Sequence, residues 1–235
     1  MTTKTIKHHV SDELLLEYAA GSLEEGWSIA VATHLALCPE CRKRLAAMEV
    51  AGGAMMEAIE PETDADFEES AWAAMLSRLE KDDGPDPVSA KRIPENTASG
   101  AEKPSAADLA IPEPLRTYIG GSLENLKWKR LGVGAYHYPI ATGDEKITAR
   151  LLRIPAGKPV PEHSHTGREL TLVLTGAFVS EGVTFGPGDL EEEDDDTVHQ
   201  PMVTPDAECI CLAVTEAPLK FQSRVVRLVQ PFLGI

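Results

Sequence analysis

The chain carries at positions 157–169 the stretch Gly157-Lys158-Pro159-Val160-Pro161-Glu162-His163-Ser164-His165-Thr166-Gly167-Arg168-Glu169. Its two histidines, His163 and His165, are separated by one residue, so on a β-strand their side chains project from the same face. Gly167 permits a turn, and Glu169 opens the apolar run that follows. Imidazole and carboxylate groups that converge in this way are ligands for a first-row metal ion. The stretch therefore predicts a metal site built from two neighbouring strands.

Residues further along extend this pattern. With Gly176, the spacing G-x5-H-x-H-x3-E-x6-G is that of the first motif of the cupin barrels. The second cupin motif is matched more loosely, because Phe185–Asp189 supplies its turn and His199 its ligand, but Val203 stands where some cupins carry Asn. Three histidines and one carboxylate suit Zn, Mn, Fe or Ni, so the donor set alone does not choose the metal. The expected ligands of this site are His163, His165, Glu169 and His199.

The second half of the chain, residues 113–235, reads as short strands bounded by Gly, Pro or Asp, with no helical period. An antiparallel barrel or jelly roll is the natural class for such a segment. The acidic run Glu191–Asp196 is interpreted as a solvated loop. The clearest strands are expected over 146–154, 169–174, 209–214 and 225–229.

Two cysteines lie on one of these predicted strands. Cys209 and Cys211 are two residues apart and therefore share a face. A disulfide between them would strain an extended strand, because their Cα atoms lie near the upper limit for such a bond. They are either two buried core thiols or a pair that senses a signal, and the sequence leaves both readings open.

The first 81 residues are punctuated as helices. Ser11 is placed to cap a helix over 12–20. Ser22-Leu23-Glu24-Glu25 has the form of a capping box and predicts a second helix that runs to about Leu37. A third helix is expected over 39–59, with proline in its first turn.

A fourth helix is indicated by one apolar stripe with the spacing i, i+3, i+4, i+7. By itself the stripe fits either ordinary core packing or a surface for a partner. The stripe consists of Trp72, Met75, Leu76 and Leu79.

A second metal site is predicted among these helices. His34 and Cys38 are four residues apart and so project from one helix face, and Cys41 follows at the start of the next helix. Either His8 or His9 could supply a fourth ligand, and a His2Cys2 tetrahedron suits zinc. A thioredoxin-like redox pair is disfavoured because no strand leads into the C-x-x-C motif.

Between the two halves lies a predicted linker. Residues 82–112 hold five prolines and no aromatic residue, a composition typical of flexible connections. We therefore expect three parts: a zinc-stabilised helical domain over 1–81, a linker over 82–112, and a metal-binding β domain over 113–235.

Composition limits the functions that the chain could have. With 22 basic and 38 acidic residues the formal charge is −16, which would repel phosphate backbones and disfavours direct nucleic-acid binding. Four cysteines are too few for a disulfide scaffold, and no segment has the pattern of a signal peptide or a membrane span. We expect a protein of the cytoplasm that does not bind membranes.

The sequence resembles the ChrR family of zinc-binding anti-sigma factors, across both halves and least in the linker. The likeness is carried by the stretches around His8–Gly21 and Ala32–Cys41 and by the cupin motifs. It implies a zinc ion in each site, and it selects His9 over His8 as the first ligand. In that family the matching ligand positions are His9, His34, Cys38 and Cys41 for the first zinc, and His163, His165, Glu169 and His199 for the second.

The resemblance also implies a function. Such a protein holds a group IV (extracytoplasmic-function) sigma factor in a 1:1 complex and releases it when the cupin domain meets singlet oxygen or an organic peroxide. The alternative is an enzyme, a metal-dependent cupin dioxygenase or isomerase with a helical zinc appendage. The sequence offers no further acid/base pair near the metal, so a non-enzyme is expected.

Overall fold

The computed structural model describes residues 5–60, 65–81, 111–132, 134–164, 167–194, 197–216 and 220–221. The chain divides into two compact units, one formed by Met1–Glu49 with Glu102–Ile235 and the other by Val50–Ala101. The first unit contains three whole α-helices, the start of a fourth and the β domain, so its parts can be placed relative to one another. No helix among these described residues combines the length and the apolar character that crossing a bilayer requires.

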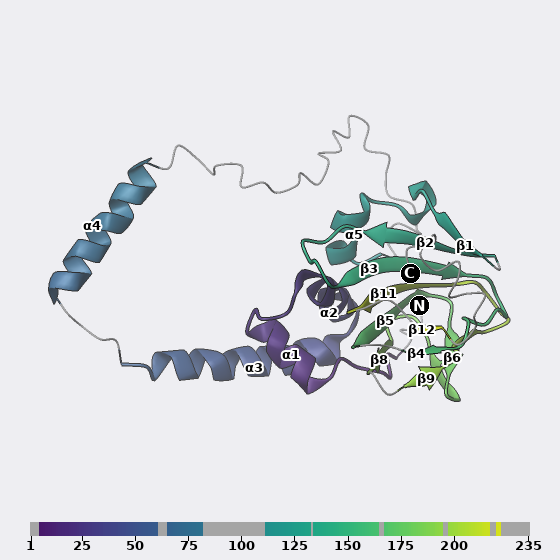
Figure 1. The fold of residues 1–235 in the computed structure, drawn as a ribbon. Coiled ribbons are helices and arrows are strands. Elements are labelled where there is room, and N and C mark those ends of the chain that lie inside the picture. Colours follow the sequence, from purple (N-terminus) through teal and green to yellow (C-terminus); the bar gives the residue numbers. More distant parts are fainter. Residues whose placement is uncertain are drawn as a thin grey trace. The chain divides into compact units, whose positions relative to one another are not determined.

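The described helices are α1 (Asp12–Ala19), α2 (Glu25–Leu37), α3 (Pro39–Glu57), α4 (Ala65–Lys81) and α5 (Glu113–Ile119). The strands are β1 (Lys129–Gly132), β2 (Ala135–Ile140), β3 (Thr148–Ile154), β4 (His163–Ser164), β5 (Glu169–Thr175), β6 (Phe178–Ser180), β7 (Val183–Phe185), β8 (Leu190–Glu193), β9 (Val198–His199), β10 (Met202–Val203), β11 (Cys209–Thr215) and β12 (Lys220–Phe221). This succession of helices and then strands confirms the predicted fold class (Figure 1). The strand expected over 225–229 and most of the predicted linker lie outside the described residues.

The strands form an antiparallel cupin-type domain. The largest sheet has six strands in the order β1-β2-β3-β11-β5-β8, and two three-stranded sheets follow the orders β10-β6-β7 and β12-β4-β9. Strand β11 lies at the centre of the large sheet, between β3 and β5, and every one of its residues is buried. In a small sheet β4 pairs with β9 so that His163 stands opposite His199. The topology thus brings the two cupin motifs together.

Helix α1 forms as its sequence predicts. The Leu14 amide donates to Ser11 Oγ at 3.3 Å, which confirms Ser11 as its N-cap. Leu14 and Leu15 are fully buried, while Asp12 and Glu13 favour the positive end of the helix dipole.

Helix α2 begins differently from the prediction. Its cap residue is Glu24, and the Ser22 hydroxyl donates to the Glu17 carbonyl at 3.1 Å, so the predicted capping box does not form. The β domain provides the cap in its place, because the Asp144 carboxylate accepts from the amides of Glu25 (3.1 Å) and Gly26 (2.7 Å). A carboxylate at this position satisfies two amides that the helix leaves unpaired and complements its dipole.

The same contact is made in the other direction. The Glu25 carboxylate accepts from the Gly143 amide and from the Tyr118 hydroxyl, the latter at 2.8 Å. Gly26 lies so close to the sheet that a Cβ atom there would be 2.7 Å from Ile147 Cγ2. Helix α2 is therefore packed directly on the β domain, and its apolar residues face protein on nearly all sides.

The helices and the barrel share one hydrophobic core. Leu15 and Trp27 belong to the same buried cluster as Leu170, Leu212 and other inward residues of the large sheet. Helix α5, which the sequence analysis did not predict, packs on α2 and adds Leu115 and Ile119 to this core. Its seven residues give too short a pattern for a helical period to be recognised.

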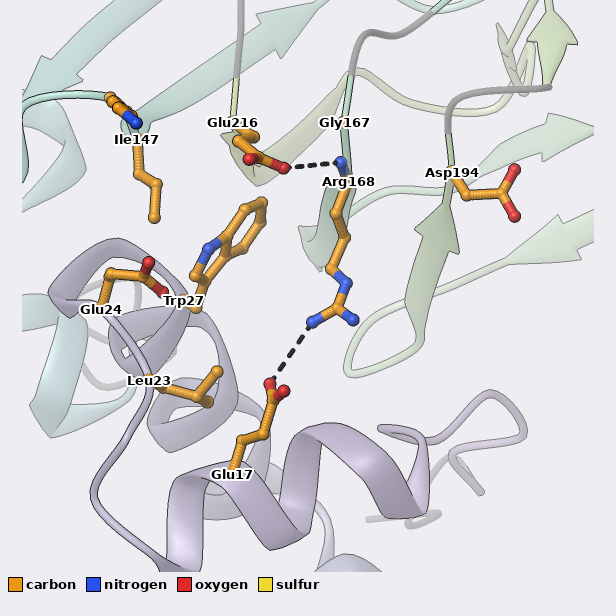
Figure 2. A pocket seen from close by; sticks show the side chains of 10 residues that line it. Glu17, Leu23, Glu24, Trp27, Ile147, Gly167, Arg168, Asp194 and Glu216 are labelled. Atoms are coloured by element: carbon orange, nitrogen blue, oxygen red, sulfur yellow. Dashed lines mark hydrogen bonds and ion pairs between the residues drawn. The ribbon is translucent and has the colours of Figure 1, made fainter.

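Arg168 makes a further contact between α1 and the barrel. Its guanidinium lies 3.5 Å from the Glu17 carboxylate and 3.8 Å from that of Glu192, and its amide donates to Glu216 at 3.4 Å. Glu17, Trp27 and Arg168 line a pocket with a volume of about 630 Å³. Figure 2 shows Arg168 reaching across this pocket toward Glu17, with Trp27 beside it.

Candidate metal centres

The first candidate centre gathers its four side chains from three elements. His9 precedes α1, His34 lies on the last turns of α2, Cys38 is the residue that ends α2, and Cys41 lies in the first turn of α3. Their ligand atoms all lie within 4.8 Å of one another. The helical spacing that predicted this convergence from the sequence is therefore present in the structure.

The distances suit a tetrahedral ion. His34 Nε2 is 3.2 Å from Cys41 Sγ, and His9 Nδ1 is 3.3 Å from Cys38 Sγ and 3.5 Å from Cys41 Sγ. Ordinary Zn–N and Zn–S bond lengths place such donor atoms about 3.6 Å apart. The donors need to move by only a few tenths of an ångström to close around zinc.

Burial sets the protonation of this centre. His34, Cys38 and Cys41 are buried, and His9 is exposed. Burial lowers the pKa of His34 to about 4, which leaves a neutral imidazole with a lone pair for a metal. Burial raises the pKa of Cys41 to about 11, so a metal ion must displace a proton when it binds there.

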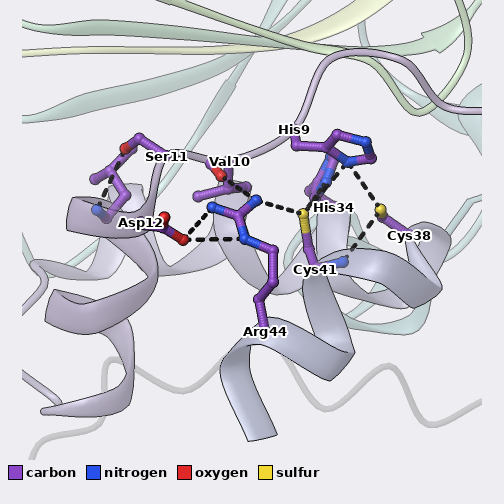
Figure 3. A network of polar contacts seen from close by, with 9 residues as sticks. His9, Val10, Ser11, Asp12, His34, Cys38, Cys41 and Arg44 are labelled. Atoms are coloured by element: carbon purple, nitrogen blue, oxygen red, sulfur yellow. Dashed lines mark hydrogen bonds and ion pairs between the residues drawn. The ribbon is translucent and has the colours of Figure 1, made fainter. Parts of the chain in front are cut away.

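Arg44 supports the centre from one turn further along α3 (Figure 3). Its guanidinium donates to the Val10 carbonyl at 3.0 Å, to Asp12, and to Cys41 Sγ at 3.8 Å. A fixed cation beside a thiolate stabilises the charge that metal binding creates there. Arg44 lies outside the ligand motif, so its role was not predicted from the sequence.

The second candidate centre lies inside the barrel. His163 Nε2 and His199 Nε2 are 3.1 Å apart, close to the separation of about 3.3 Å expected for two imidazoles on one zinc ion. His163 Nδ1 donates to the Pro161 carbonyl at 2.8 Å, which places the lone pair of this ring on Nε2. His199 Nδ1 lies 3.2 Å from Ser180 Oγ. Both rings are thus oriented by their other nitrogen, as metal-binding histidines commonly are.

The remaining predicted ligands are placed less completely. Glu169 is buried and lines the same cavity, where the Thr171 hydroxyl donates to its Oε1 at 3.1 Å. Among the described residues, Glu169 does not join His163 and His199 in a group of donors within 4.8 Å of one another. His165 lies outside the described residues.

Two carboxylates that the sequence analysis overlooked lie beside His199. Glu191 and Glu193 are two residues apart on β8, and their oxygens are 3.9 and 3.8 Å from His199 Nδ1. The interpretation of 191–196 as a solvated loop is therefore wrong for residues 191–193, because the period of two on a strand turns Glu191 inward. Burial raises the pKa of Glu191 to about 8, and its Oε1 has no hydrogen-bond partner among the described residues.

Cys209 and Cys211 line the cavity as well. Both are buried free thiols on β11. The neighbouring Cys209 and burial together raise the pKa of Cys211 well above its usual value, which keeps that thiol protonated. The cavity that they share with Glu191 and the two histidines has a volume of about 50 Å³.

Comparison with known proteins identifies the family to which this architecture belongs. Residues 118–218 match the family model of the ChrR cupin-like domain. The anti-sigma-E factor ChrR of Cereibacter sphaeroides is 45% identical over 231 residues, which is 98% of this chain and 100% of that protein. The chain belongs to the ChrR family. This confirms the resemblance recognised in the sequence.

A solved structure extends the match to three dimensions. It is the crystal structure of Rhodobacter sphaeroides SigE in complex with the anti-sigma ChrR. The likeness has a TM-score of 0.69 and 41% identity, and it covers 90% of this chain and 99% of that chain. The match to the ChrR family therefore covers both the helical region and the cupin domain.

Proposed function

We propose that this ChrR-family chain is an anti-sigma factor that binds one group IV (extracytoplasmic-function) sigma factor in a 1:1 complex. The named relative is an anti-sigma-E factor, and the solved relative was crystallised with its sigma factor. On this proposal the chain acts in the cytoplasm, where its target works, and its acidic surface does not contact nucleic acid directly.

The observation that carries this proposal is an exposed apolar stripe on α4. Trp72 and Leu79 are 60% and 62% exposed, and Met75 and Leu76 lie between them on the same face. Apolar side chains are likewise exposed at the end of α3 and just beyond it, namely Val50, Met55, Met56 and Ile59. Large exposed apolar faces mark protein interaction sites, and methionines make such faces adaptable.

The direct test is purification of the tagged full-length chain from extract of its own bacterium. We expect one sigma factor of the extracytoplasmic-function group to co-purify in equimolar amount, identified by mass spectrometry. If core RNA polymerase or no sigma factor were recovered, the proposal would be wrong.

We propose zinc as the ion of the first centre, held by His9, His34, Cys38 and Cys41. The geometry, the neutral His34 ring and the two thiols fit a closed structural site. Bound zinc would supply a crosslink that joins the N-terminal segment, α2 and α3. We also propose that residues 1–81 bind the sigma factor, that residues 82–112 are a linker, and that residues 113–235 sense the signal.

We propose a second zinc ion in the barrel, held by His163, His165, Glu169 and His199, with Glu191 and Glu193 as nearby oxygen donors. Replacing His199 by Ala should lower the zinc content of the full-length protein from about two ions per chain to about one, measured by mass spectrometry of the metal. Zinc of the first centre should stay, because His199 is not one of its donors. An unchanged total would show that His199 binds no metal.

Glu191 also gives the enzyme alternative its best support, because a buried carboxyl group with a raised pKa near a metal site is typical of an acid/base catalyst. The size of the cavity argues against it. About 50 Å³ is far below the several hundred Å³ of ordinary substrate pockets and holds little more than a water molecule or dioxygen. We therefore propose a sensor that admits small oxidants. Steady oxygen uptake with small diketones by the metal-loaded protein would favour the dioxygenase.

For the releasing signal we propose a reactive oxygen species acting in the cupin domain. Of the two signals expected from the sequence, singlet oxygen and an organic peroxide, the small volume of the cavity favours singlet oxygen. Cys209 and Cys211 are the sensing candidates, since both line the cavity beside the metal-binding histidines. The raised pKa of Cys211 makes that thiol a slow nucleophile without metal, so sensing through it depends on its position beside the proposed metal.

A further inference from the structure

We infer that Asp189 of the barrel holds the zinc ligand His9 in position, so that the barrel completes the first metal centre. This inference rests on the proposed zinc assignment and goes beyond it. It assigns a positioning role to a residue of the cupin turn that contributes no donor to either centre.

His9 is the least constrained member of its centre. The other three donors lie on or at the ends of helices α2 and α3 and are buried, whereas His9 is exposed and precedes the first residue of α1. Its position therefore depends on the extended residues before it. Those residues are held by the barrel.

The contacts between this segment and the turn are numerous. Asp189 Oδ1 accepts from the amides of Lys7 at 2.6 Å and His8 at 3.0 Å. The His8 carbonyl accepts from the Leu190 amide at 3.2 Å, and the His8 ring packs on Phe185 with centroids 4.4 Å apart. The barrel thus pairs with the residue directly before His9 at both its amide and its carbonyl.

Two features show that the turn is shaped for this segment. Asp189 Oδ2 accepts from the Gly186 amide at 2.8 Å, which fixes the carboxylate with its other oxygen toward the chain. Gly188 has φ 91°, and a Cβ atom there would lie 2.6 Å from Ile6 Cδ1. Glycine therefore serves both the turn and the close approach of Ile6.

The turn also leads directly into the barrel cavity. Leu190 follows Asp189 as the first residue of β8, and Glu191, the next residue, lies 3.9 Å from His199. A shift of β8 caused by a change at His199 would move the carboxylate that holds residues 7 and 8. Asp189 consequently connects the proposed sensing site to the segment that carries His9, covalently through β8 on one side and by hydrogen bonds to residues 7 and 8 on the other.

The test is the rate at which a coloured chelator, 4-(2-pyridylazo)resorcinol, removes zinc from the full-length protein. The Asp189→Asn variant keeps only one side-chain oxygen at this position, so it cannot accept both from the Gly186 amide and from the amides of Lys7 and His8. We therefore expect zinc of the first centre to be lost about tenfold faster or more, as for other residues that orient metal ligands. Ile6→Ala should also accelerate the loss of zinc, and it leaves the residues of the barrel turn unchanged.

Asp144→Asn is the matched control. It removes the carboxylate that caps α2 from the barrel, and its contacts are with Glu25 and Gly26, nine and eight residues before His34. We expect it to lower the melting temperature and to leave the rate of zinc loss near that of the wild type.

The outcomes separate the two ideas. If wild-type protein held no zinc at the first centre, the zinc assignment itself would fail. If the wild type held zinc, and Asp189→Asn and Ile6→Ala released it at the wild-type rate, the positioning role would be refuted. Equal acceleration by Asp144→Asn would also refute it, because any loosening of helices from the barrel would then suffice.

Discussion

Replacing Cys38 and Cys41 together by Ser should remove one zinc ion per chain and abolish binding to the sigma factor. Serine hydroxyls do not replace thiolates as zinc ligands, so two of the four donors are lost. A structural zinc ion contributes apparent folding free energy on the order of 10 kcal/mol, which exceeds the stability of many whole domains. Metal content, circular dichroism and sigma binding by calorimetry measure the effect.

The matched control uses the other cysteine pair. Cys209 and Cys211 are equally buried but lie in the barrel cavity, so their double replacement by Ser should leave the first zinc ion and sigma binding intact. Retention of both zinc and sigma binding by the Cys38/Cys41 variant would show that these thiols are not ligands. The anti-sigma proposal would then stand without a role for zinc at these thiols, supported by the apolar stripe of α4 and by the likeness to the anti-sigma-E factor ChrR.

The parts of this protein that could be predicted from sequence are those fixed by neighbouring residues. Ser11 caps α1 through an amide three residues away. His34 and Cys38 meet because helix geometry brings residues four apart to one face, and Cys41 follows in the first turn of α3. The spacing of His163 and Glu169 fixes strands on either side of a turn, and both residues line one cavity.

The parts that could not be predicted depend on residues far away in the chain. The capping box at Ser22 has the right local pattern, yet Asp144, more than a hundred residues later, caps α2 in its place. His8 and His9 are indistinguishable by spacing, and only the pairing of His8 with the turn at Asp189 leaves His9 to face the thiols. Such long-range choices carry no periodic signal in the sequence.

Glu191 shows a second reason why a prediction was wrong, namely that the acidic composition of its segment hid the period of a strand. A run of acidic residues is usually solvated, and this general tendency predicts a solvated loop over 191–196. The alternation that places Glu191 inside and Glu192 outside is visible only once the run is known to be a strand. The turn at Phe185–Asp189, which the second cupin motif supplied, was the available signal that a strand follows.

The apolar stripe of α4 leads to the second large effect. Replacing Trp72 and Leu76 together by Ala should weaken binding to the sigma factor by about a thousandfold, because two large apolar anchors at the centre of an interface contribute about 2 kcal/mol each. Stability of the free chain should change much less than binding, since Trp72 is 60% exposed and Leu76 is 41% exposed. Titration calorimetry with the purified sigma factor measures the affinity, and circular dichroism checks that the variant remains folded.

Ala74→Gln is the control on the same helix, because residue 74 lies on the face opposite the stripe. It adds a larger side chain without touching the stripe, and it should bind like the wild type. If the double variant bound normally, the stripe would have to be a surface for something other than the sigma factor. If Ala74→Gln were equally defective, α4 would act as a whole helix and not through one face. The expected pattern, a large loss from two exposed residues at little cost in folding, is the one that distinguishes a binding surface from a core, because side chains of a core cannot be removed without destabilising the fold.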